Sequence, residues 1–151
     1  MPKNQLKVRI RLVIIKNDQL LAYYDSIDDY YFYIGGKLEF GETIQECWER
    51  EIKEELGEEV KFAFQKILYI RDFILEEANE HSLELFILGD INKFKEIDGR
   101  PDPEFDGKKW PTWLDINNLP DNLYPKNLSK KLLADYQNGF PKTREYIGRM
   151  E

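Results

Sequence analysis

The chain has 151 residues, of which 42% are apolar and 14% aromatic, enough to build the core of one domain and unlike the composition of a disordered protein. Its formal net charge of −7 argues against binding of a nucleic acid polymer through a basic surface. The single cysteine, Cys47, excludes an internal disulfide and a cysteine-rich zinc site.

The first residues predict neither a leader nor a membrane anchor. Met1 to Arg9 is polar and lacks the apolar centre of a signal peptide, and no run of about 18 apolar residues follows. We therefore expect a cytoplasmic protein with no membrane partner, organised as one domain over residues 1–151.

Strand patterns dominate the first forty residues. Val8 to Ile15 and Gln19 to Tyr24 are rich in β-branched and apolar residues, and the turn residues Asn17-Asp18 between them predict a hairpin. An acidic loop precedes Tyr30 to Ile34, a short aromatic strand that we expect to stop at Gly35-Gly36; the alternative is that Lys37 to Phe40 continues it before Gly41.

Thr43 to Leu56 is the clearest predicted helix. Thr43 and Glu46 form a capping box at its start, and Gly57 stands where a left-handed residue commonly ends a helix. Both ends of this helix are therefore indicated by the sequence.

The second half of the chain continues with strands and one more helix. We expect strands at Val60–Phe73, His81–Gly89 and Trp110–Leu114, a polar loop at Asn92–Lys109, a helix at Ser129–Gln137, and a polar tail at Lys142–Glu151 that frays or contacts a partner. Strands interleaved with two helices indicate an α/β or α+β layered domain.

A helical wheel separates three kinds of side chain on the first helix. Its apolar stripe consists of Ile44, Trp48, Ile52 and Leu56, while Glu46, Glu49, Arg50 and Lys53 face the opposite side. Glu51, Glu54 and Glu55 share one flank, and Glu55 falls inside the apolar arc. A carboxylate in that position is expected to be paired or bound to a metal ion.

Three carboxylates at positions i, i+3 and i+4 repel one another unless a cation lies between them. Their hard oxygen atoms suit Mg²⁺, or alternatively Mn²⁺, rather than zinc. The alternative is a solvated acidic face, which is the usual explanation for a glutamate-rich helix. The residues before the helix favour the metal site.

Those residues complete a long gapped pattern. Gly36 is followed after five residues by Glu42, and after seven more by Arg50-Glu51-Ile52-Lys53-Glu54-Glu55-Leu56-Gly57. This pattern resembles the Nudix box of the Nudix hydrolase family. The usual apolar residue after the final glycine is replaced by Glu58, so we expect Val60 to take its place in packing.

The resemblance implies an α/β/α sandwich with a mixed sheet, in which the box forms a loop, a helix and a second loop. It further implies that Glu51, Glu54 and Glu55 ligate the metal ions, with Gly36 beside them. Arg50 would orient a catalytic carboxylate, and Glu42 would support Arg50.

The identity of the general base stays open in the sequence. Glu51 and Glu54 belong to the box, whereas Glu104, and after it Asp106, lie in a loop before the last strand, where some members of the family carry an extra carboxylate. Glu104 is the preferred candidate, although a solvated loop residue is the plainer explanation. Glu84 alternates with apolar residues and faces either the cleft or solvent.

Substrate contacts are expected from the first strands. Arg9 and Arg11 share one strand face and could bind phosphate, or simply be surface charges. Gly35 would let the backbone approach a phosphate. The aromatic residues from Tyr23 to Tyr33, Tyr24 among them, could stack on a base or belong to the core.

Together these patterns predict an enzyme that uses Mg²⁺ and an activated water to cleave the phosphoanhydride of a nucleoside diphosphate derivative, either a nucleoside triphosphate or a nucleotide sugar. The alternatives are a nucleotide-sensing module on the same fold and a plain acidic interaction domain. An isopentenyl diphosphate isomerase is disfavoured by the lack of a second cysteine. By analogy with the family, a homodimer is expected.

Overall fold

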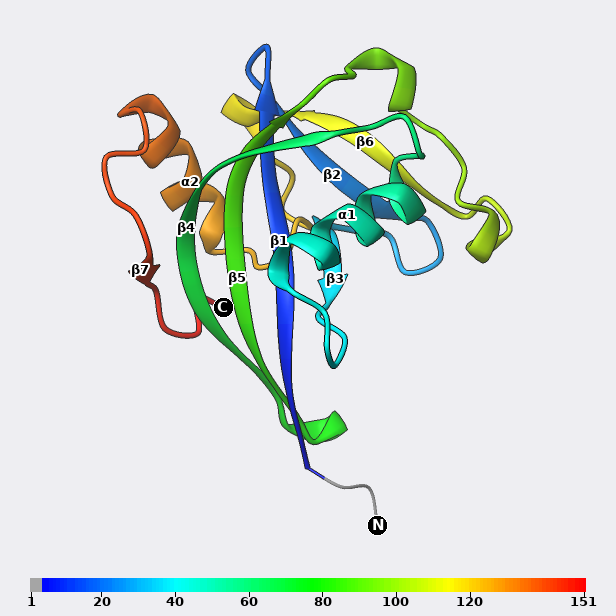
Figure 1. Cartoon of the computed structure of the whole chain (residues 1–151). Coiled ribbons are helices and arrows are strands. Elements are labelled where there is room, and N and C mark those ends of the chain that lie inside the picture. The colour runs from blue at the N-terminus through cyan, green and yellow to red at the C-terminus, as the bar shows by residue number, and fades with distance from the viewer. Residues whose placement is uncertain (1–3) are drawn as a thin grey trace.

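A computed structural model describes residues 4–151 of the chain. Residues 1–3 of the expected domain, and of its polar start, lie outside the described residues. Within the described part, seven strands form one mixed sheet in the order β6-β2-β3-β1-β5-β4-β7, with a helix on each face (Figure 1). The strands are β1 (Gln5–Lys16), β2 (Gln19–Asp25), β3 (Tyr30–Lys37), β4 (Phe62–Leu75), β5 (Glu80–Ile91), β6 (Lys109–Asp115) and β7 (Glu145–Tyr146); the helices are α1 (Ile44–Glu55) and α2 (Leu128–Gln137).

The central strand β1 connects the two halves of the sheet. It pairs antiparallel with β3 and parallel with β5, while its end turns through Asn17 and Asp18 into β2. Both turn residues have positive φ, the geometry that the right-handed twist of a hairpin requires. The predicted hairpin and the predicted mixed α/β sandwich are confirmed.

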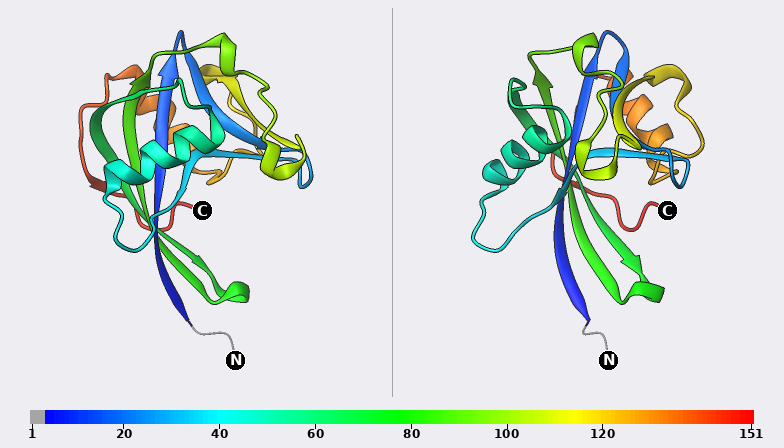
Figure 2. Two further views of the ribbon diagram at one scale, coloured as in Figure 1. Left: turned by 45° about the vertical axis from the view of Figure 1, so that its right-hand side comes forward. Right: turned by 90° about the vertical axis from the view of Figure 1, so that its right-hand side faces the viewer.

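Alternation along β1 supplies both hydrophobic cores. Ile10, Leu12 and Ile14 face the core under α1, whereas Val13 faces the core under α2. Arg9 and Arg11 therefore point to the α2 side of the sheet, at the end of the strand that α2 does not cover. Figure 2 shows the two helices on opposite faces, and β1, β4 and β5 extending beyond the body.

Helix α1 forms as the sequence predicted. The Thr43 side chain accepts from the Glu46 backbone amide at 3.1 Å, the Glu46 carboxylate accepts from the Thr43 amide at 3.0 Å, and Gly57 has a φ of +114°. Val60 is 5% exposed and belongs to the core under α1, which confirms its expected packing role.

Two predictions about the path of the chain are wrong. Strand β3 does not stop at the two glycines but continues through them to Lys37, because β1 supplies pairing partners opposite both. The tail does not fray: Glu145–Tyr146 pair with β4, and the Asp72 amide donates to the Gly148 carbonyl at 2.9 Å. No helix in residues 4–151 is both long and apolar enough to cross a bilayer.

Candidate active site

Glu55 occupies the position that the helical wheel marks as unusual. Its side chain lies within the apolar face of α1, only 6% of the residue is exposed, and its Oε1 accepts from the Gly35 backbone amide at 2.9 Å. Burial raises the pKa of Glu55 well above the usual value, and the negative charge of Glu51 adds to this shift. The helix therefore holds a buried carboxylate against the glycine segment of β3.

Glu51 lies beside the second glycine of that segment. A Cβ atom added to Gly36 would come within 2.4 Å of Glu51 Oε1, so only glycine leaves room for this carboxylate. Burial also raises the pKa of Glu51, an effect that the neighbouring Arg50 opposes. Strand β3 thus presents bare backbone to Glu51 and Glu55.

Arg50 connects the helix to the loop before it. Its Nε and Nη2 atoms donate to the two carboxylate oxygens of Glu42 at 2.7 and 3.0 Å, and its Nη1 donates to Glu51 at 2.8 Å. These contacts, with Arg50 as the main cause, lower the pKa of Glu42 to about 2. The structure therefore brings Glu42, Arg50 and Glu51 together, in the arrangement that the resemblance implies.

The side chains on the flank of α1 are chemically suited to a hard divalent cation. In the geometry described for residues 4–151, no three acidic, histidine or cysteine side chains converge on one point, because Glu51 turns to Arg50 and Glu55 to Gly35. Glu54 is exposed, 3.6 Å from Arg50. A buried carboxylate with one hydrogen bond, beside a second carboxylate that only a glycine accommodates, nevertheless fits Mg²⁺ in its oxygen chemistry and charge.

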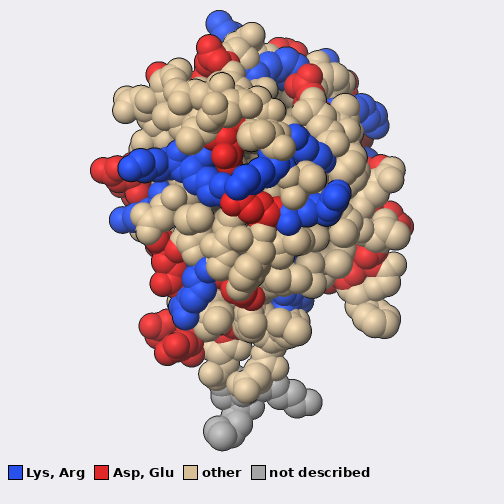
Figure 3. Space-filling view, turned by 90° about the vertical axis from the view of Figure 1, so that its left-hand side faces the viewer, with Lys and Arg blue, Asp and Glu red and all other residues tan. Residues whose placement is uncertain are grey.

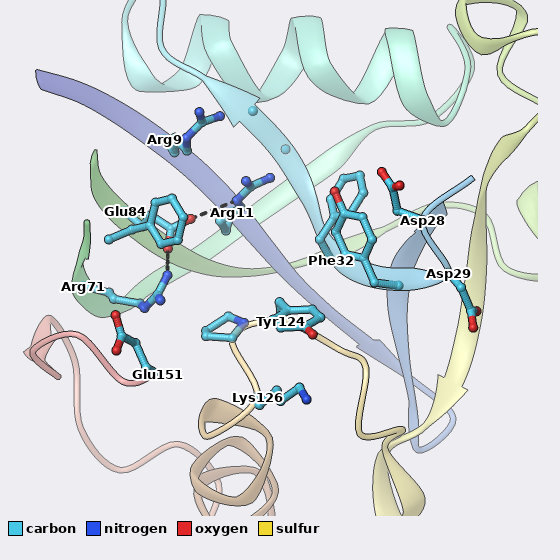
Figure 4. A pocket seen from close by; sticks show the side chains of 15 residues that line it. Arg9, Arg11, Asp28, Asp29, Phe32, Arg71, Glu84, Tyr124, Lys126 and Glu151 are labelled. Atoms are coloured by element: carbon cyan, nitrogen blue, oxygen red, sulfur yellow. Dashed lines mark hydrogen bonds and ion pairs between the residues drawn. The ribbon is translucent and has the colours of Figure 1, made fainter. Parts of the chain in front are cut away.

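A cavity of about 810 Å³ opens beyond the glycine segment, on the α2 side of the sheet. Figure 4 shows β3 between this cavity and α1, with the arginines of β1 on one side and aromatic rings on the other. The cavity is lined by four basic residues, Arg9, Arg11, Arg71 and Lys126, by the rings of Tyr30, Phe32, Phe73 and Tyr124, and by Asp28, Asp29, Gly35, Gly36, Glu84, Pro125 and Glu151.

Both predicted substrate-binding arginines line the cavity. Arg9 donates to Ser82 at 3.3 Å and pairs with Glu80, while Arg11 pairs with Glu84 at 3.2 Å. Glu84, which the sequence left undecided, is 5% exposed and lines the cavity. In the surface view of the side that carries β7, Lys and Arg side chains form a band despite the net negative charge (Figure 3).

The aromatic residues divide between cavity and core. Tyr30 and Phe32 line the cavity with ring centroids 5.5 Å apart. Tyr24 lies outside the cavity lining: its hydroxyl donates to Asp29 at 2.6 Å, and its ring packs 5.2 Å from that of Trp110. Tyr124, which the sequence gave no reason to single out, approaches from the segment before α2, a position that only the tertiary structure reveals.

The loop before β6 brings Asp102 near α1, and not Glu104, which was the preferred candidate for the general base in the sequence. Glu104 is exposed on a short 3-10 turn (Pro103–Phe105), whereas Asp102 is 4% exposed, accepts from the Tyr23 hydroxyl, and contributes to the raised pKa of Glu55. Asp102 caps this turn by accepting from the Glu104 amide at 2.9 Å. The Asp-Pro pair was the available sequence signal for a capping residue.

Cys47 has a packing role. It is fully buried in the core under α1, and burial raises the pKa of its thiol to about 12. A thiol with a raised pKa is a poor nucleophile at neutral pH.

Fold and site together define an α/β/α protein in which an acidic helix packs against a glycine segment, and this segment lines a basic and aromatic cavity. A family model described as NUDIX domain matches residues 6–135, which include all of these elements except the tail. The chain belongs to the Nudix hydrolase family, as the sequence predicted. The alternative of a plain acidic interaction domain is therefore not supported.

Solved structures share the fold at low sequence identity. A MutT NUDIX hydrolase from Burkholderia pseudomallei has a TM-score of 0.66 at 21% identity, with 86% of this chain and 97% of that chain covered. A UDP-X diphosphatase has a TM-score of 0.69 at 18% identity, covering 97% and 70%. An ADP-ribose pyrophosphatase from Streptococcus suis 89-1591 has a TM-score of 0.65 at 19% identity, covering 93% and 97%. No curated protein matches the sequence.

Proposed function

We propose that this protein is a Mg²⁺-dependent pyrophosphohydrolase that cleaves the phosphoanhydride of a nucleoside diphosphate derivative, with a nucleoside triphosphate or a nucleotide sugar as substrate. The observation that carries the proposal is Glu55, a carboxylate buried against the Gly35 amide and separated from a basic cavity only by the bare backbone of β3. A stably folded protein rarely retains an uncompensated buried charge without a functional reason.

The two ends of the cavity suit the two parts of such a substrate. Arg11 and Gly35-Gly36 border the end next to α1, where anionic phosphate oxygens would meet a guanidinium and a backbone segment without side chains. Tyr30, Phe32 and Tyr124 border the other end, where their faces could stack on a base. This arrangement supports an orientation of the substrate in which the phosphates, rather than the base, lie beside the acidic helix.

We assign the metal to Glu51, Glu54 and Glu55, with the backbone at Gly36 beside it. Mg²⁺ bound there, or Mn²⁺ in its place, would neutralise phosphate charge and make a bound water more acidic. Glu42 holds Arg50 through two hydrogen bonds, and Arg50 in turn holds Glu51 in place.

For the proton of the attacking water we favour Glu51 over Glu104. Glu51 lies against Gly36, which lines the cavity, whereas Glu104 is exposed on a 3-10 turn; neither glutamate lines the cavity itself. A general base must lie within hydrogen-bonding reach of the water that it deprotonates.

The test is a hydrolysis assay with nucleoside triphosphates, oxidised nucleotides, nucleotide sugars, ADP-ribose and dinucleoside polyphosphates, each with Mg²⁺, Mn²⁺ or EDTA. We expect metal-dependent release of a nucleoside monophosphate or diphosphate. Glu54→Gln and Glu55→Gln should lose about a hundredfold or more in kcat. Glu49→Gln, an exposed glutamate on the same helix, is the matched control. Metal-dependent binding of one of these compounds without turnover would instead identify a nucleotide-sensing module.

A further inference from the structure

Three charged side chains form a chain of contacts along one wall of the cavity. Glu84 on β5 accepts from Arg11 of β1 at 3.2 Å with one carboxylate oxygen, and from Arg71 of β4 with the other. Figure 4 shows Glu84 between the two guanidinium groups. Glu84 is 5% exposed and Arg71 is 4% exposed, so the contacts are largely shielded from solvent.

The chain of contacts fixes Arg11 in one orientation. Arg11 Nε donates to Glu84, its Nη1 is 3.4 Å from the Tyr33 carbonyl, and its guanidinium lies 5.8 Å from the centre of the Phe32 ring. Within residues 4–151, the Nη2 atom has no protein acceptor. Arg11 is therefore held on one edge, and its other nitrogen can serve a ligand in the cavity that it lines.

The C-terminal segment holds Arg71, the residue at the far end of this series of contacts. Arg71 Nε donates to the Arg149 carbonyl at 2.5 Å, and the Arg71 guanidinium lies 5.1 Å from the centre of the Phe73 ring. The segment itself is attached to β4, since the Ile147 amide donates to the Ile70 carbonyl at 3.0 Å. Arg71 therefore cannot turn away from Glu84 without losing contacts to the docked tail.

The charges of these three residues do not cancel. One carboxylate lies between two guanidinium groups, so the group carries one excess positive charge beside the cavity. A buried ionic group is costly unless every charge finds a partner. Glu51 and Glu55 lie within electrostatic range of Arg11, but among the described residues only Glu84 forms an ion pair with it; an anionic phosphate at the free edge of Arg11 would add a second direct partner.

We propose that Glu84 and Arg71 are positioning residues, which act on substrate through Arg11 and hold its guanidinium against a phosphate group of the substrate. The proposal rests on the proposed function. It adds the requirement that Glu84 and Arg71, which the C-terminal segment holds in place, orient Arg11. Positioning matters because a displacement of about 1 Å at a reacting group can cost roughly a hundredfold in rate.

A double-mutant cycle in the whole protein tests the coupling, using Arg11→Met, Glu84→Gln and the double variant on the substrate found in the hydrolysis assay. We expect Glu84→Gln to lower kcat/KM about tenfold on its own, but less than about twofold in the Arg11→Met background, because its partner is already gone. Equal losses in both backgrounds would overturn the proposal.

Arg71→Lys provides a second variant that keeps the charge but loses the forked geometry. We expect it to lower kcat/KM in the same direction as Glu84→Gln, with the loss again absent in the Arg11→Met background. The matched control is Asp90→Asn on β5, the strand that carries Glu84, since Asp90 is exposed, pairs with Lys16 and lies outside this cavity lining. The control should retain the activity of the unmodified protein.

Binding of inorganic pyrophosphate with Mg²⁺, followed by calorimetry, separates this proposal from the proposed function. If the unmodified protein cleaves no compound, the same cycle measured on pyrophosphate binding still decides about Glu84: non-additive losses support positioning, and additive losses overturn it. Absence of pyrophosphate binding by the unmodified protein would remove the phosphate role of Arg11 and overturn the proposal as well.

Discussion

At the scale of single residues, Glu55 shows how function and stability oppose each other in this protein. Its carboxylate receives one hydrogen bond, from Gly35, and is buried on the apolar face of α1, within electrostatic range of Glu51, Arg11 and Asp102. Burying an ionised carboxylate with so little compensation is unfavourable. The same burial prepares Glu55 to bind a cation strongly.

The sign of the effect on stability follows from the raised pKa of Glu55. Because the folded protein binds this proton more tightly than the unfolded chain, the contribution of Glu55 is most favourable below its ordinary pKa of 4.5. It becomes less favourable as pH rises from there through the folded-state pKa. The metal-free protein is therefore destabilised by Glu55 at neutral pH.

We predict that Glu55→Gln raises the free energy of unfolding of the metal-free protein at about pH 8 by on the order of 1 kcal/mol, or a few degrees in Tm. Thermal denaturation in EDTA measures this difference, which should shrink as the pH is lowered towards 4.5. A lower Tm for the variant at high pH would show that the ionised carboxylate stabilises the fold.

At the scale of elements, the junction of β3 and α1 builds the centre of the site. Strand β3 crosses the space between α1 and the cavity, and two consecutive glycines leave that crossing without side chains. At Gly35, with a φ of +134°, an added Cβ would lie 2.0 Å from the Ile10 carbonyl oxygen, so the fold itself requires glycine there. At Gly36 the three atoms nearest to an added Cβ all belong to the Glu51 carboxylate.

Gly36→Ala should therefore lower the activity more than it lowers the stability of the fold. The added methyl group pushes aside the flexible Glu51 side chain, so we expect a loss of about tenfold or more in kcat/KM, with a decrease in Tm of only a few degrees. Steady-state kinetics and thermal denaturation measure the two effects. Gly41→Ala is the control, because its Cβ meets nothing within 4 Å and activity per folded molecule should be kept.

Element boundaries were predictable where local chemistry sets them. Thr43, Glu46 and Gly57 define both ends of α1 in the sequence and in the structure, because capping involves neighbours along the chain. The continuation of β3 through Gly35 and Gly36 was not predictable, since those residues stay extended only through pairing with Arg11 and Ile10.

At the scale of the whole molecule, the sheet separates two hydrophobic cores and places the acidic helix on one face and the cavity on the other. The glycine segment of β3 lies between the two regions. Binding of a metal ion on the α1 side should therefore stabilise the folded protein as a whole, because the unfolded chain has no assembled site.

We predict that Mg²⁺ raises the Tm of the unmodified protein by about 5–10 °C at a concentration roughly a hundred times its dissociation constant. Differential scanning calorimetry with and without EDTA measures the shift. It should be much smaller in Glu54→Gln and unchanged in Glu49→Gln. An equal shift in all three proteins would mean that Mg²⁺ binds elsewhere.

The sequence by itself determined the class of fold, the extent of α1, and the set of residues in the Nudix box. These features depend on periodicity, capping and spacing within about twenty residues, and such local patterns can be recognised in the amino-acid sequence. The burial of Glu55 was likewise implied by its place on the wheel, and the structure shows it.

Only the tertiary structure decided which residues share the cavity. Arg11, Arg71, Glu84 and Tyr124 come from three strands and a loop that are far apart in the chain. Parallel pairing of β1 with β5 brings Arg11 close to Glu84, and antiparallel pairing of β4 with β5 places Arg71 opposite Glu84. The position of Asp102, rather than Glu104, beside Tyr23 depends on how a long loop folds back. Such contacts join residues tens of positions apart, so no local pattern encodes them; they follow from the packing of the sheet as a whole.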